Sequence, residues 1–369
     1  MINDKKHVYK HMIKFYLSFL YGTIYNIYLL NKIFFLFEFL SIPNIILISF
    51  IITSIFFISI IIFNYISQKI YMFLYYYFFF ILSIYFFFCL SSVLMIFLIV
   101  FFGLNFILLN FIVYVIFGSL LMIFGIYSKN NTILEKNLIK VKDLKTKIKF
   151  AHLTDMHLGV MYGKNFVEKL IKLINKEKNI DFIVITGDIV DGNIKLSEEM
   201  LKPFDSLNIP IYYVTGNHEE YTNKKENLEI IHKSKIKHLQ NTFITINNNI
   251  NLIGIDFNWD IYKSKQELIK LRNLNKNSYP NILLYHSPIF KVDDLQSNNI
   301  FLFLCGHTHG GQIFPLHIIY KFLFGVLDGL YEFKNNIYIY CCSGCGTSWG
   351  PVRFLSKSKI GIIELIPKN

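Results

Sequence analysis

Two histidines separated by one residue stand just behind an apolar run, Ile300–Cys305. In an extended chain, residues i and i+2 point to the same side, so His307 and His309 present two imidazoles together. Gly310 and Gly311 follow, and glycine lets a backbone turn sharply and approach a ligand closely. This arrangement is typical of metal ligands at a sheet edge, although a His-x-His pair also occurs in ordinary polar turns. The choice depends on whether the rest of the chain supplies matching ligands.

Polar side chains of the same kind follow four further apolar runs that are predicted to be strands, Ile148–Leu153, Asp181–Thr186, Ile211–Thr215 and Asn281–Tyr285. Each run finishes beside carboxylate, amide or imidazole groups, most of them next to Gly or Pro. Five strand ends of this kind are not expected by chance. The candidate residues behind the four runs are Asp155, His157, Asp188, Asp191, Asn217, His218 and His286.

Ligands that mix oxygen and nitrogen suit borderline divalent ions such as Mn, Fe or Zn. Two Asp, one Asn and four His give seven candidate ligands, which is too many for one tetrahedral zinc. Two ions are the simpler interpretation, with Asp188 as the candidate bridge because a carboxylate offers one oxygen to each of two metals. In hydrolytic sites such ions lie about 3.5 to 4 Å apart, activate water and clamp a phosphoryl group for in-line attack.

The five blocks, in the order Asp-x-His, Gly-Asp-x-x-Asp, Gly-Asn-His-Glu, a lone His and Gly-His-x-His, resemble the calcineurin-like metallophosphoesterases. They run from Asp155 to His309, and the full set is far more specific than any single block. The longer stretch His152–Gly159 and the later Ser348–Arg353 resemble the bacterial YkuE- and YaeI-like branch, including members with several N-terminal membrane helices. The resemblance implies a four-layer αββα sandwich and two divalent metal ions.

The resemblance also implies a role for each residue of the site. His218 is the expected general acid, a task that suits an imidazole near neutral pH, and Asp191 is the carboxylate expected to orient it. The expected metal ligands are Asp155, His157 and His309 for one ion, Asn217, His286 and His307 for the other, and Asp188 as the bridge.

Two positions depart from the family pattern. Gly192 stands where protein Ser/Thr phosphatases have Arg, which argues against that substrate class. Lys359 stands where relatives are expected to have Glu, and no function is attached to the change. The other histidines after the apolar region are expected to be structural: His152, His232, His238 and His317.

The N-terminal region of the chain is almost entirely apolar or aromatic. Between residues 13 and 127 the charged residues are Lys14, Lys32, Glu38 and Lys69. A helix needs about 20 apolar residues to cross the hydrocarbon core, so we expect an all-α bundle of about four transmembrane helices. The expected spans are Met12–Leu30, Asn44–Ile66, Ile70–Leu90 and Leu104–Tyr127.

Lysines flank this apolar region on both sides. Positive residues mark the cytoplasmic side of a membrane protein, so both ends predict the cytoplasm and an even number of spans. We therefore expect a multi-pass protein of the cell membrane with a cytoplasmic catalytic domain. The lysines are Lys5, Lys6, Lys10 and Lys14 before or within the first span, and Lys129, Lys136, Lys140, Lys142 and Lys145 after the last.

Composition divides the chain into a transmembrane region, 1–128, a Lys-rich polar linker, 129–147, and a catalytic domain, 148–369. In the last part, short apolar runs alternate with amphipathic stretches, which indicates a layered α/β domain. Further strands are expected at 242–247, 251–257, 337–342 and 359–366, and helices at 165–178, 197–207 with a kink at Pro203, 224–234 and 263–274.

The formal net charge is +12, and nearly all the basic residues are Lys. Such a bias also arises from an AT-rich coding sequence, so no nucleic-acid partner is expected. Five cysteines, an odd number in a long chain, suit a reducing compartment better than a disulfide framework. Cys341, Cys342 and Cys345 are interpreted as small residues at the end of a buried strand, because no second Cys pair completes a thiolate metal site.

Together these features predict a membrane-anchored, dinuclear phosphoesterase that hydrolyses phosphoester or pyrophosphate bonds. The tether favours an anionic lipid or a lipid-linked nucleotide, such as UDP-diacylglucosamine, as substrate. The alternative is a transporter or receptor whose phosphoesterase-like domain only binds a ligand. Against it, charges in the apolar region lie near the span ends except Glu38, and binding alone does not need the proton donor His218.

Overall fold

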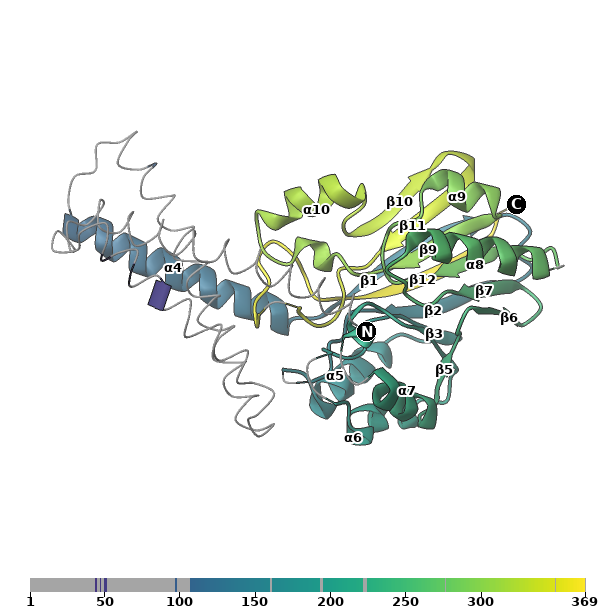
Figure 1. The fold of residues 1–369 in the computed structure, drawn as a ribbon, viewed down its shortest axis with the longest axis horizontal. Coiled ribbons are helices and arrows are strands. Elements are labelled where there is room, and N and C mark those ends of the chain that lie inside the picture. Colours follow the sequence, from purple (N-terminus) through teal and green to yellow (C-terminus); the bar gives the residue numbers. More distant parts are fainter. Residues whose placement is uncertain are drawn as a thin grey trace. The chain divides into compact units, whose positions relative to one another are not determined.

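The structure of the protein is a computed structural model (Figure 1). It describes residues 107–159, 161–192, 195–221, 224–275, 277–348 and 350–368, together with residues 44, 47, 50, 51 and 97. The chain forms two compact units, Met1–Phe124 and Gly125–Asn369. The second unit contains all of the candidate site residues.

The expected membrane spans fall on the N-terminal part of the chain. The first three, at 12–30, 44–66 and 70–90, lie outside the described residues apart from a few isolated positions. Helix α4, Ile107–Asn130, covers most of the fourth, at 104–127. In the part of the chain that the structure describes, no helix combines the length and the apolar character that crossing a membrane requires.

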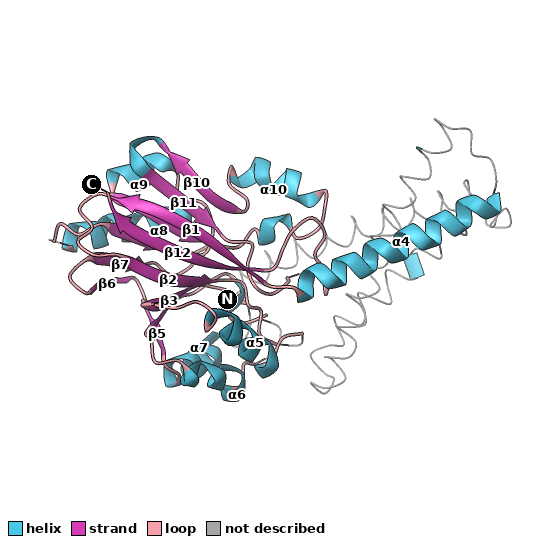
Figure 2. Cartoon of the chain, turned by 180° about the vertical axis from the view of Figure 1, so that it is seen from behind, coloured by secondary structure: helices cyan, strands magenta, loops and turns pink. Residues whose placement is uncertain are grey.

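Two six-stranded mixed sheets form the second unit (Figure 2). The first sheet has the order β1-β12-β2-β3-β4-β5. Strands β2 to β5 run parallel to one another, β12 runs antiparallel to β2, and β1 runs parallel to β12. The strands are β1 Ile133–Val141, β2 Ile148–Leu153, β3 Phe182–Thr186, β4 Ile211–Val214, β5 Ile236–His238 and β12 Lys359–Pro367.

The second sheet has the order β10-β11-β9-β8-β7-β6. Strands β7, β8, β9 and β11 run parallel, and the edge strands β6 and β10 run antiparallel to their neighbours. The strands are β6 Thr242–Ile246, β7 Ile250–Gly254, β8 Asn281–Leu284, β9 Ile300–Cys305, β10 Gly329–Phe333 and β11 Ile337–Cys341.

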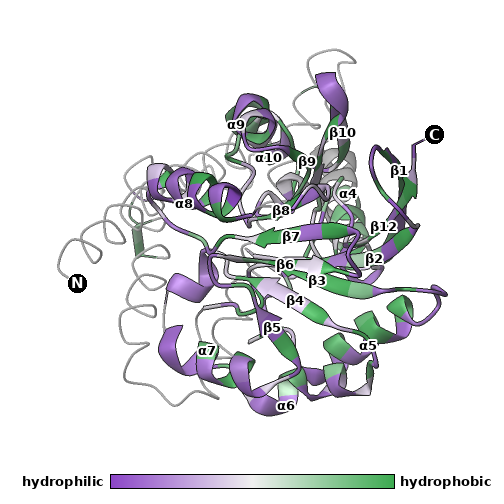
Figure 3. Ribbon diagram, turned by 90° about the vertical axis from the view of Figure 1, so that its right-hand side faces the viewer, coloured by the Kyte–Doolittle hydropathy of each residue, from purple (hydrophilic) through white to green (hydrophobic). Residues whose placement is uncertain are grey.

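Helices cover the outer face of each sheet, so the unit has four layers. Buried apolar side chains form three clusters: between α5, α6, α7 and the first sheet, between the two sheets, and between the second sheet and α8 and α9. Figure 3 shows the two groups of helices on opposite sides of the paired sheets. This confirms the expected α/β class. The helices are α5 Lys164–Ile174, α6 Glu198–Leu201, α7 Lys224–Lys233, α8 Ile261–Leu274, α9 Val292–Ser297 and α10 Leu316–Phe324.

The layer between the sheets explains why the central strands are continuous apolar runs in the sequence. Phe150 on β2 stacks on Phe182 on β3, with ring centroids 4.9 Å apart. Leu284 on β8 and Leu304 on β9 belong to the same buried cluster. Parallel strands covered on both faces need apolar residues on both, so they lose the alternation that marks a half-exposed strand.

Strand β1 lies inside the segment 129–147 that sequence analysis assigns to a linker. It pairs with β12 along its whole length. Lys136 and Lys140 are exposed, whereas Ile139 and Val141, at alternate positions, are buried. Charged residues are common on edge strands because they prevent further pairing. Because of these lysines, the segment has the composition of a polar linker. The alternation of exposed and buried residues that is typical of a strand was therefore not recognised in the sequence.

Lys359, the position where Glu is expected in relatives, begins β12. Its ammonium group lies 2.7 Å from Glu135 Oε1 and 2.6 Å from Asp328 Oδ2. Burial acts to lower the pKa of Lys359, but the two carboxylates outweigh burial and raise it. Glu135 also accepts a hydrogen bond of 2.8 Å from the Tyr340 hydroxyl. A lysine fits this position because both of its charged neighbours are acidic.

Besides β1, the elements β5, β10, α9 and α10 were not predicted from the sequence. The expected break at Pro203 is present, because α6 ends at Leu201 and continues as a 3-10 segment, Lys202–Ser206.

The four cysteines of the second unit are free and buried. This agrees with their interpretation as small core residues.

Candidate metal centre

The candidate residues follow the carboxyl ends of β2, β3, β4, β8 and β9. Five of them have positive φ angles: 52° at Asp155, 50° at His157, 52° at Asp188, 71° at His307 and 50° at His309. Residues other than glycine rarely adopt this left-handed conformation, and such strain persists only where the surrounding structure enforces it. The backbone is thus bent in the way that turns these side chains toward one another.

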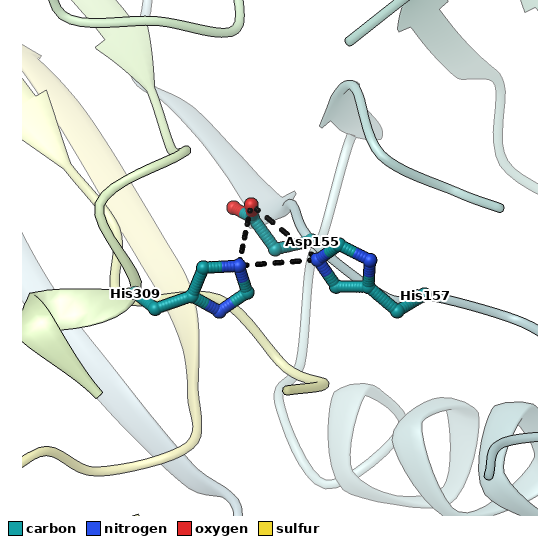
Figure 4. A group of neighbouring side chains, drawn as sticks. All are labelled: Asp155, His157 and His309. Atoms are coloured by element: carbon teal, nitrogen blue, oxygen red, sulfur yellow. Dashed lines mark hydrogen bonds and ion pairs between the residues drawn. The ribbon is translucent and has the colours of Figure 1, made fainter. Parts of the chain in front are cut away.

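Asp155, His157 and His309 form one compact group (Figure 4). His157 Nε2 lies 3.1 Å from His309 Nε2, and Asp155 Oδ1 lies 3.3 Å from His309 Nε2 and 3.9 Å from His157 Nε2. The Nδ1 atoms of both histidines are buried without a hydrogen-bond partner. Two imidazole nitrogens this close share at most one proton, so with a carboxylate beside them their lone pairs suit a cation.

Asp188 lies at the centre of the site. Its Oδ2 atom is 3.2 Å from His286 Nε2, 3.8 Å from His218 Nε2 and 3.9 Å from His157 Nε2. Asp188 belongs to two of the three side-chain groups in the described residues that are able to hold a metal ion. It therefore has the position that a carboxylate bridging two ions needs.

The remaining predicted ligands converge on His286. Its Nε2 atom lies 3.0 Å from Asn217 Oδ1 and 3.1 Å from His307 Nδ1. Its Nδ1 atom lies 2.8 Å from the backbone oxygen of Thr186, which can only accept a hydrogen bond, and this fixes the ring orientation. The structure thus brings all seven predicted ligands together, from strand ends of both sheets.

Burial keeps most of the site histidines neutral. It lowers the pKa of His157 and His309 well below the usual value; neighbouring histidines and Arg353 add to this effect, and Asp188 opposes it. Burial likewise lowers the pKa of His307 to about 3. A neutral imidazole retains the lone pair with which it binds a metal ion, so these three rings are ready to act as ligands at neutral pH.

Asp188 and His286 shift each other's pKa toward the charged form. Burial acts to raise the pKa of Asp188, but His286 and His218 outweigh it and hold the pKa well below its usual value. Burial acts to lower the pKa of His286, but Asp188 outweighs it and raises the pKa to about 10. In the metal-free protein, His286 therefore carries a proton that compensates the buried negative charge.

Comparisons with known proteins agree with this geometry. A family model described as calcineurin-like phosphoesterase matches residues 148–311. An uncharacterized metallophosphoesterase of Aquifex aeolicus is 31% identical over 262 residues, which covers 67% of this chain and 98% of that protein. The chain belongs to the calcineurin-like phosphoesterase family. The family predicted from the five sequence blocks is confirmed, and with it the class of metal-dependent phosphoesterases.

Two further relatives match a smaller share of their own length. An uncharacterized metallophosphoesterase of Helicobacter pylori is 35% identical over 239 residues, and the match covers 63% of each chain. A "Transmembrane protein with metallophosphoesterase domain" of Danio rerio is 30% identical over 243 residues, covering 61% of this chain and 55% of that protein. The chain therefore spans less than two thirds of the length of these two relatives.

The His218 side chain is 13% exposed, which is more than for the His157, His286 and His309 side chains. Its Nδ1 atom lies 2.7 Å from the backbone oxygen of Asp191, which accepts the hydrogen bond, so Nε2 faces Asp188. The bond to this ring comes from the Asp191 backbone, and Asp191 Oδ1 lies 4.0 Å from His157 Nδ1. The orienting role expected for the Asp191 carboxylate stays a prediction.

Glu219 is a residue of the site that sequence analysis did not assign. It is fully buried, and its carboxylate accepts hydrogen bonds from the backbone N–H groups of Asp188, Ile189 and Gly216 at 3.0, 2.8 and 2.6 Å. These contacts join the turn after β3 to the turn after β4. Burial and the charge of Asp188 raise the pKa of Glu219 to about 7. The signal was present, since Glu219 closes the Gly-Asn-His-Glu block.

Gly216 and Gly306 allow the turns of the site to approach one another. A Cβ atom at Gly216 would lie 2.1 Å from Asp188 Oδ1, and one at Gly306 would lie 2.3 Å from Asp155 Oδ2. Both distances are far inside van der Waals contact. Only glycine at these two positions leaves room for the carboxylates.

Arg353 is the second residue that sequence analysis did not assign a role. Its buried guanidinium donates to the backbone oxygens of Ser343, Gly344, Gly346 and His309, at 2.6, 3.1, 2.6 and 3.1 Å. It thereby fixes the turn after β11 against the segment that carries the last two histidines.

Arg353 also supports a second ligand through Gly346. The Gly346 N–H donates to the backbone oxygen of Asp155 at 2.7 Å. The guanidinium is therefore one hydrogen bond from His309 and two from Asp155, which belong to the same ligand group. These contacts suit a residue that positions ligands, and Arg353 is the last residue of the Ser348–Arg353 stretch that resembles the YkuE- and YaeI-like branch.

The other described histidines lie outside the ligand groups. His152 is buried between the sheets, where its Nε2 lies 2.7 Å from Thr186 Oγ1, and burial lowers its pKa to about 3. His238 lies 2.8 Å from Asp256 and 3.0 Å from His232. His317 packs beside Phe314. These contacts support the structural roles predicted for these histidines.

Metal binding should strengthen as the pH rises. The pKa of His286 is about 10 in the metal-free protein, so between pH 7 and 9 the ring must lose a proton before Nε2 binds an ion. We expect the association constant for Mn²⁺ to rise about tenfold per pH unit, measured by titration calorimetry of the full chain. His286→Asn removes the titrating ring and should flatten this dependence; an unchanged slope in the variant would contradict the assignment.

Replacing Arg353 by Lys should weaken metal binding without removing a ligand. Lysine keeps the charge but lacks the planar fork that holds several carbonyls. We expect a loss of about 10- to 100-fold in Mn²⁺ affinity, as for other groups that orient metal ligands, together with a lower Tm. The matched control is Arg272→Lys, because Arg272 is exposed on α8 and should change neither quantity. Equal affinities in the two variants would refute the positioning role.

Proposed function

We propose that the chain is a membrane-anchored phosphoesterase that uses two divalent ions, Mn, Fe or Zn, to hydrolyse phosphoester or pyrophosphate bonds. The observation that carries the proposal is the convergence of seven ligands from five strand ends around Asp188. Asp155, His157 and His309 would hold one ion, Asn217, His286 and His307 the other, and Asp188 both. Bound there, the ions supply Lewis acidity toward the phosphoryl group and water.

His218 supplies the proton that the leaving oxygen needs. Its Nδ1 atom is committed to the Asp191 backbone oxygen, so a proton on Nε2 points toward the site, where Asp188 Oδ2 lies 3.8 Å away. The side chain is 13% exposed, which allows the ring to exchange protons with water between turnovers. Donation from Nε2 to the departing alkoxide is general acid catalysis.

The substrate class follows from two features. Gly192 has φ of 79°, and a Cβ atom there would lie 2.7 Å from the His218 backbone oxygen. The side chain of the Arg found in protein Ser/Thr phosphatases is therefore not accommodated beside His218, which supports a different substrate. The apolar region before residue 128 supports an amphiphilic one, and we propose an anionic lipid or a lipid-linked nucleotide such as UDP-diacylglucosamine.

Two observations support the proposed membrane anchor: the apolar composition of the N-terminal region and the name of one relative. Residues 13–127 contain four charged side chains, and the Danio rerio relative is named a transmembrane protein. The YkuE- and YaeI-like branch that the sequence resembles includes members with several N-terminal membrane helices. Lysines at both ends of the apolar region favour an even number of spans, with the catalytic unit in the cytoplasm.

The general-acid role predicts a loss that depends on the leaving group. His218→Ala in the full chain with Mn²⁺ should lower kcat about 10²- to 10⁴-fold for a dialkyl phosphodiester. It should lower kcat far less for bis-p-nitrophenyl phosphate, because p-nitrophenolate leaves without a proton. Metal content measured by mass spectrometry should stay at two ions per chain, and His232→Ala on α7 is the control. Equal losses for both substrates would instead assign His218 to metal binding, and no hydrolysis by the unmodified chain would refute the function.

The topology is testable at the turn between β1 and β2. Lys142, Lys145 and Lys147 are exposed there, so trypsin has access to them in the folded unit. We expect cleavage in inside-out membrane vesicles and protection in right-side-out vesicles until detergent is added. Cleavage of intact right-side-out vesicles would overturn the cytoplasmic assignment.

A further inference from the structure

Helix α10 presents apolar side chains to solvent. Ile318, Ile319, Phe322 and Leu323 are 58%, 52%, 89% and 66% exposed. Their spacing, i, i+1, i+4 and i+5, places them on one face of the helix. A surface helix of a soluble domain normally turns its apolar stripe toward the core. An outward apolar face of this size instead fits a partner that is itself apolar.

This face lies at the rim of the metal centre. The segment that carries His307 and His309 leads directly into α10, and the Leu316 N–H donates to the Ile313 backbone oxygen at 2.9 Å. Phe324, at the end of α10, meets the ring of His307 edge-on, with centroids 5.6 Å apart. Helix α10 therefore connects its exposed apolar face to a candidate ligand across the width of one helix, about 10 Å.

A pair of aromatic side chains continues the same rim. Tyr221 and Trp259 stack with centroids 6.3 Å apart and are 47% and 64% exposed. Tyr221 accepts a hydrogen bond from Asn217 Nδ2 at 2.8 Å, and its ring centroid lies 4.6 Å from that of His218. This aromatic pair therefore also borders the candidate metal centre. Tyr and Trp are enriched where a membrane meets water, because one end of each ring system is apolar and the other polar.

The chain enters the catalytic unit beside this rim. Gly125, the first residue of the unit, accepts a hydrogen bond of 2.9 Å from the Arg353 N–H. The next residue, Phe354, donates to the Gln312 backbone oxygen at 2.8 Å and accepts from the Phe314 N–H at 3.2 Å. Gln312 and Phe314 lead into α10, so the connection to the apolar region is a few hydrogen-bonded residues away from the exposed face.

We propose that α10, with Tyr221 and Trp259, docks on the bilayer surface and seats the metal centre at the level of the lipid head groups. The inference rests on the proposed membrane anchor, and it adds the surface through which the catalytic unit meets the lipid. Helices of this kind insert about 5–10 Å into the interface. Lys321, also exposed on α10, supplies a positive charge for anionic head groups.

The test follows a fluorescent label on α10 in vesicles. The full chain, with Cys89→Ser and its four other cysteines buried, is labelled with NBD at Leu323→Cys and reconstituted in phosphatidylcholine and phosphatidylglycerol. The control label is at Leu274→Cys on α8, which is 59% exposed. Neighbouring Asn275 hydrogen-bonds to Asn281 at the start of β8, so the control lies at the opposite end of the strands from the metal centre.

We expect brominated lipid to quench the label at position 323 but not at 274, and aqueous iodide to quench it several-fold less at 323. Equal iodide quenching at both positions would overturn the proposal. Protection from iodide without quenching by brominated lipid would also overturn it, because another protein segment or a second copy would then cover α10.

A second experiment separates docking from catalysis. Ile318→Ser, Phe322→Ser and Leu323→Ser are combined, and Ile269→Ser with Leu274→Ser on α8 is the matched control. Both proteins should hydrolyse bis-p-nitrophenyl phosphate equally, while only the α10 variant should lose at least tenfold in activity toward a vesicle-embedded phosphodiester relative to the control. Equal activity toward vesicles would refute docking and leave the proposed chemistry intact. Absence of hydrolysis of the soluble ester in every protein would refute the chemistry, and the label at 323 would still decide the docking.

Discussion

The buried negative charge of Asp188 is the constraint on which the rest of the site depends. A carboxylate removed from water requires close compensation by hydrogen bonds and positive charge. Its Oδ1 atom accepts the His218 backbone N–H at 2.9 Å, and its Oδ2 atom faces imidazoles from three strand ends. Packing two sheets with their polar strand ends together supplies this compensation, and it leaves a nitrogen-rich pocket that a divalent ion would stabilise further.

Two buried charges of opposite sign hold the strained turns in place. Glu219 gathers backbone N–H groups from the turns after β3 and β4, whereas Arg353 gathers backbone oxygens around His309 and the turn after β11. Positive φ angles at five ligands cost free energy, of order 1–3 kcal/mol each. The cost is met by interactions outside the ligand set, which is why the site extends well beyond the residues that would touch a metal.

The ligands could be predicted from the sequence because each is a local signal, a polar residue directly behind an apolar strand. Glu219 was equally visible, as the last residue of a block that already supplied Asn217 and His218. Arg353 was not, because its role depends on turns brought together only by the tertiary fold. Strand β1 was hidden by its exposed lysines, and α10 by an apolar face that points outward and so breaks the pattern of a surface helix. The α/β fold class could be predicted from the sequence, because it depends only on the alternation of apolar and amphipathic stretches.

The position of β12 has a consequence for synthesis. The last strand of the chain lies between β1 and β2, so the first sheet closes only after the ribosome has made residues 359–367. Until then β1 has no neighbour, and the turn that carries Arg353 has only just been made. The chain therefore passes through a stage in which every candidate ligand, from Asp155 to His309, has been made but β1 and β2 still lack the strand that joins them. Until β12 is made, the first sheet has an open edge beside β2, and such an edge is a template for pairing with another chain.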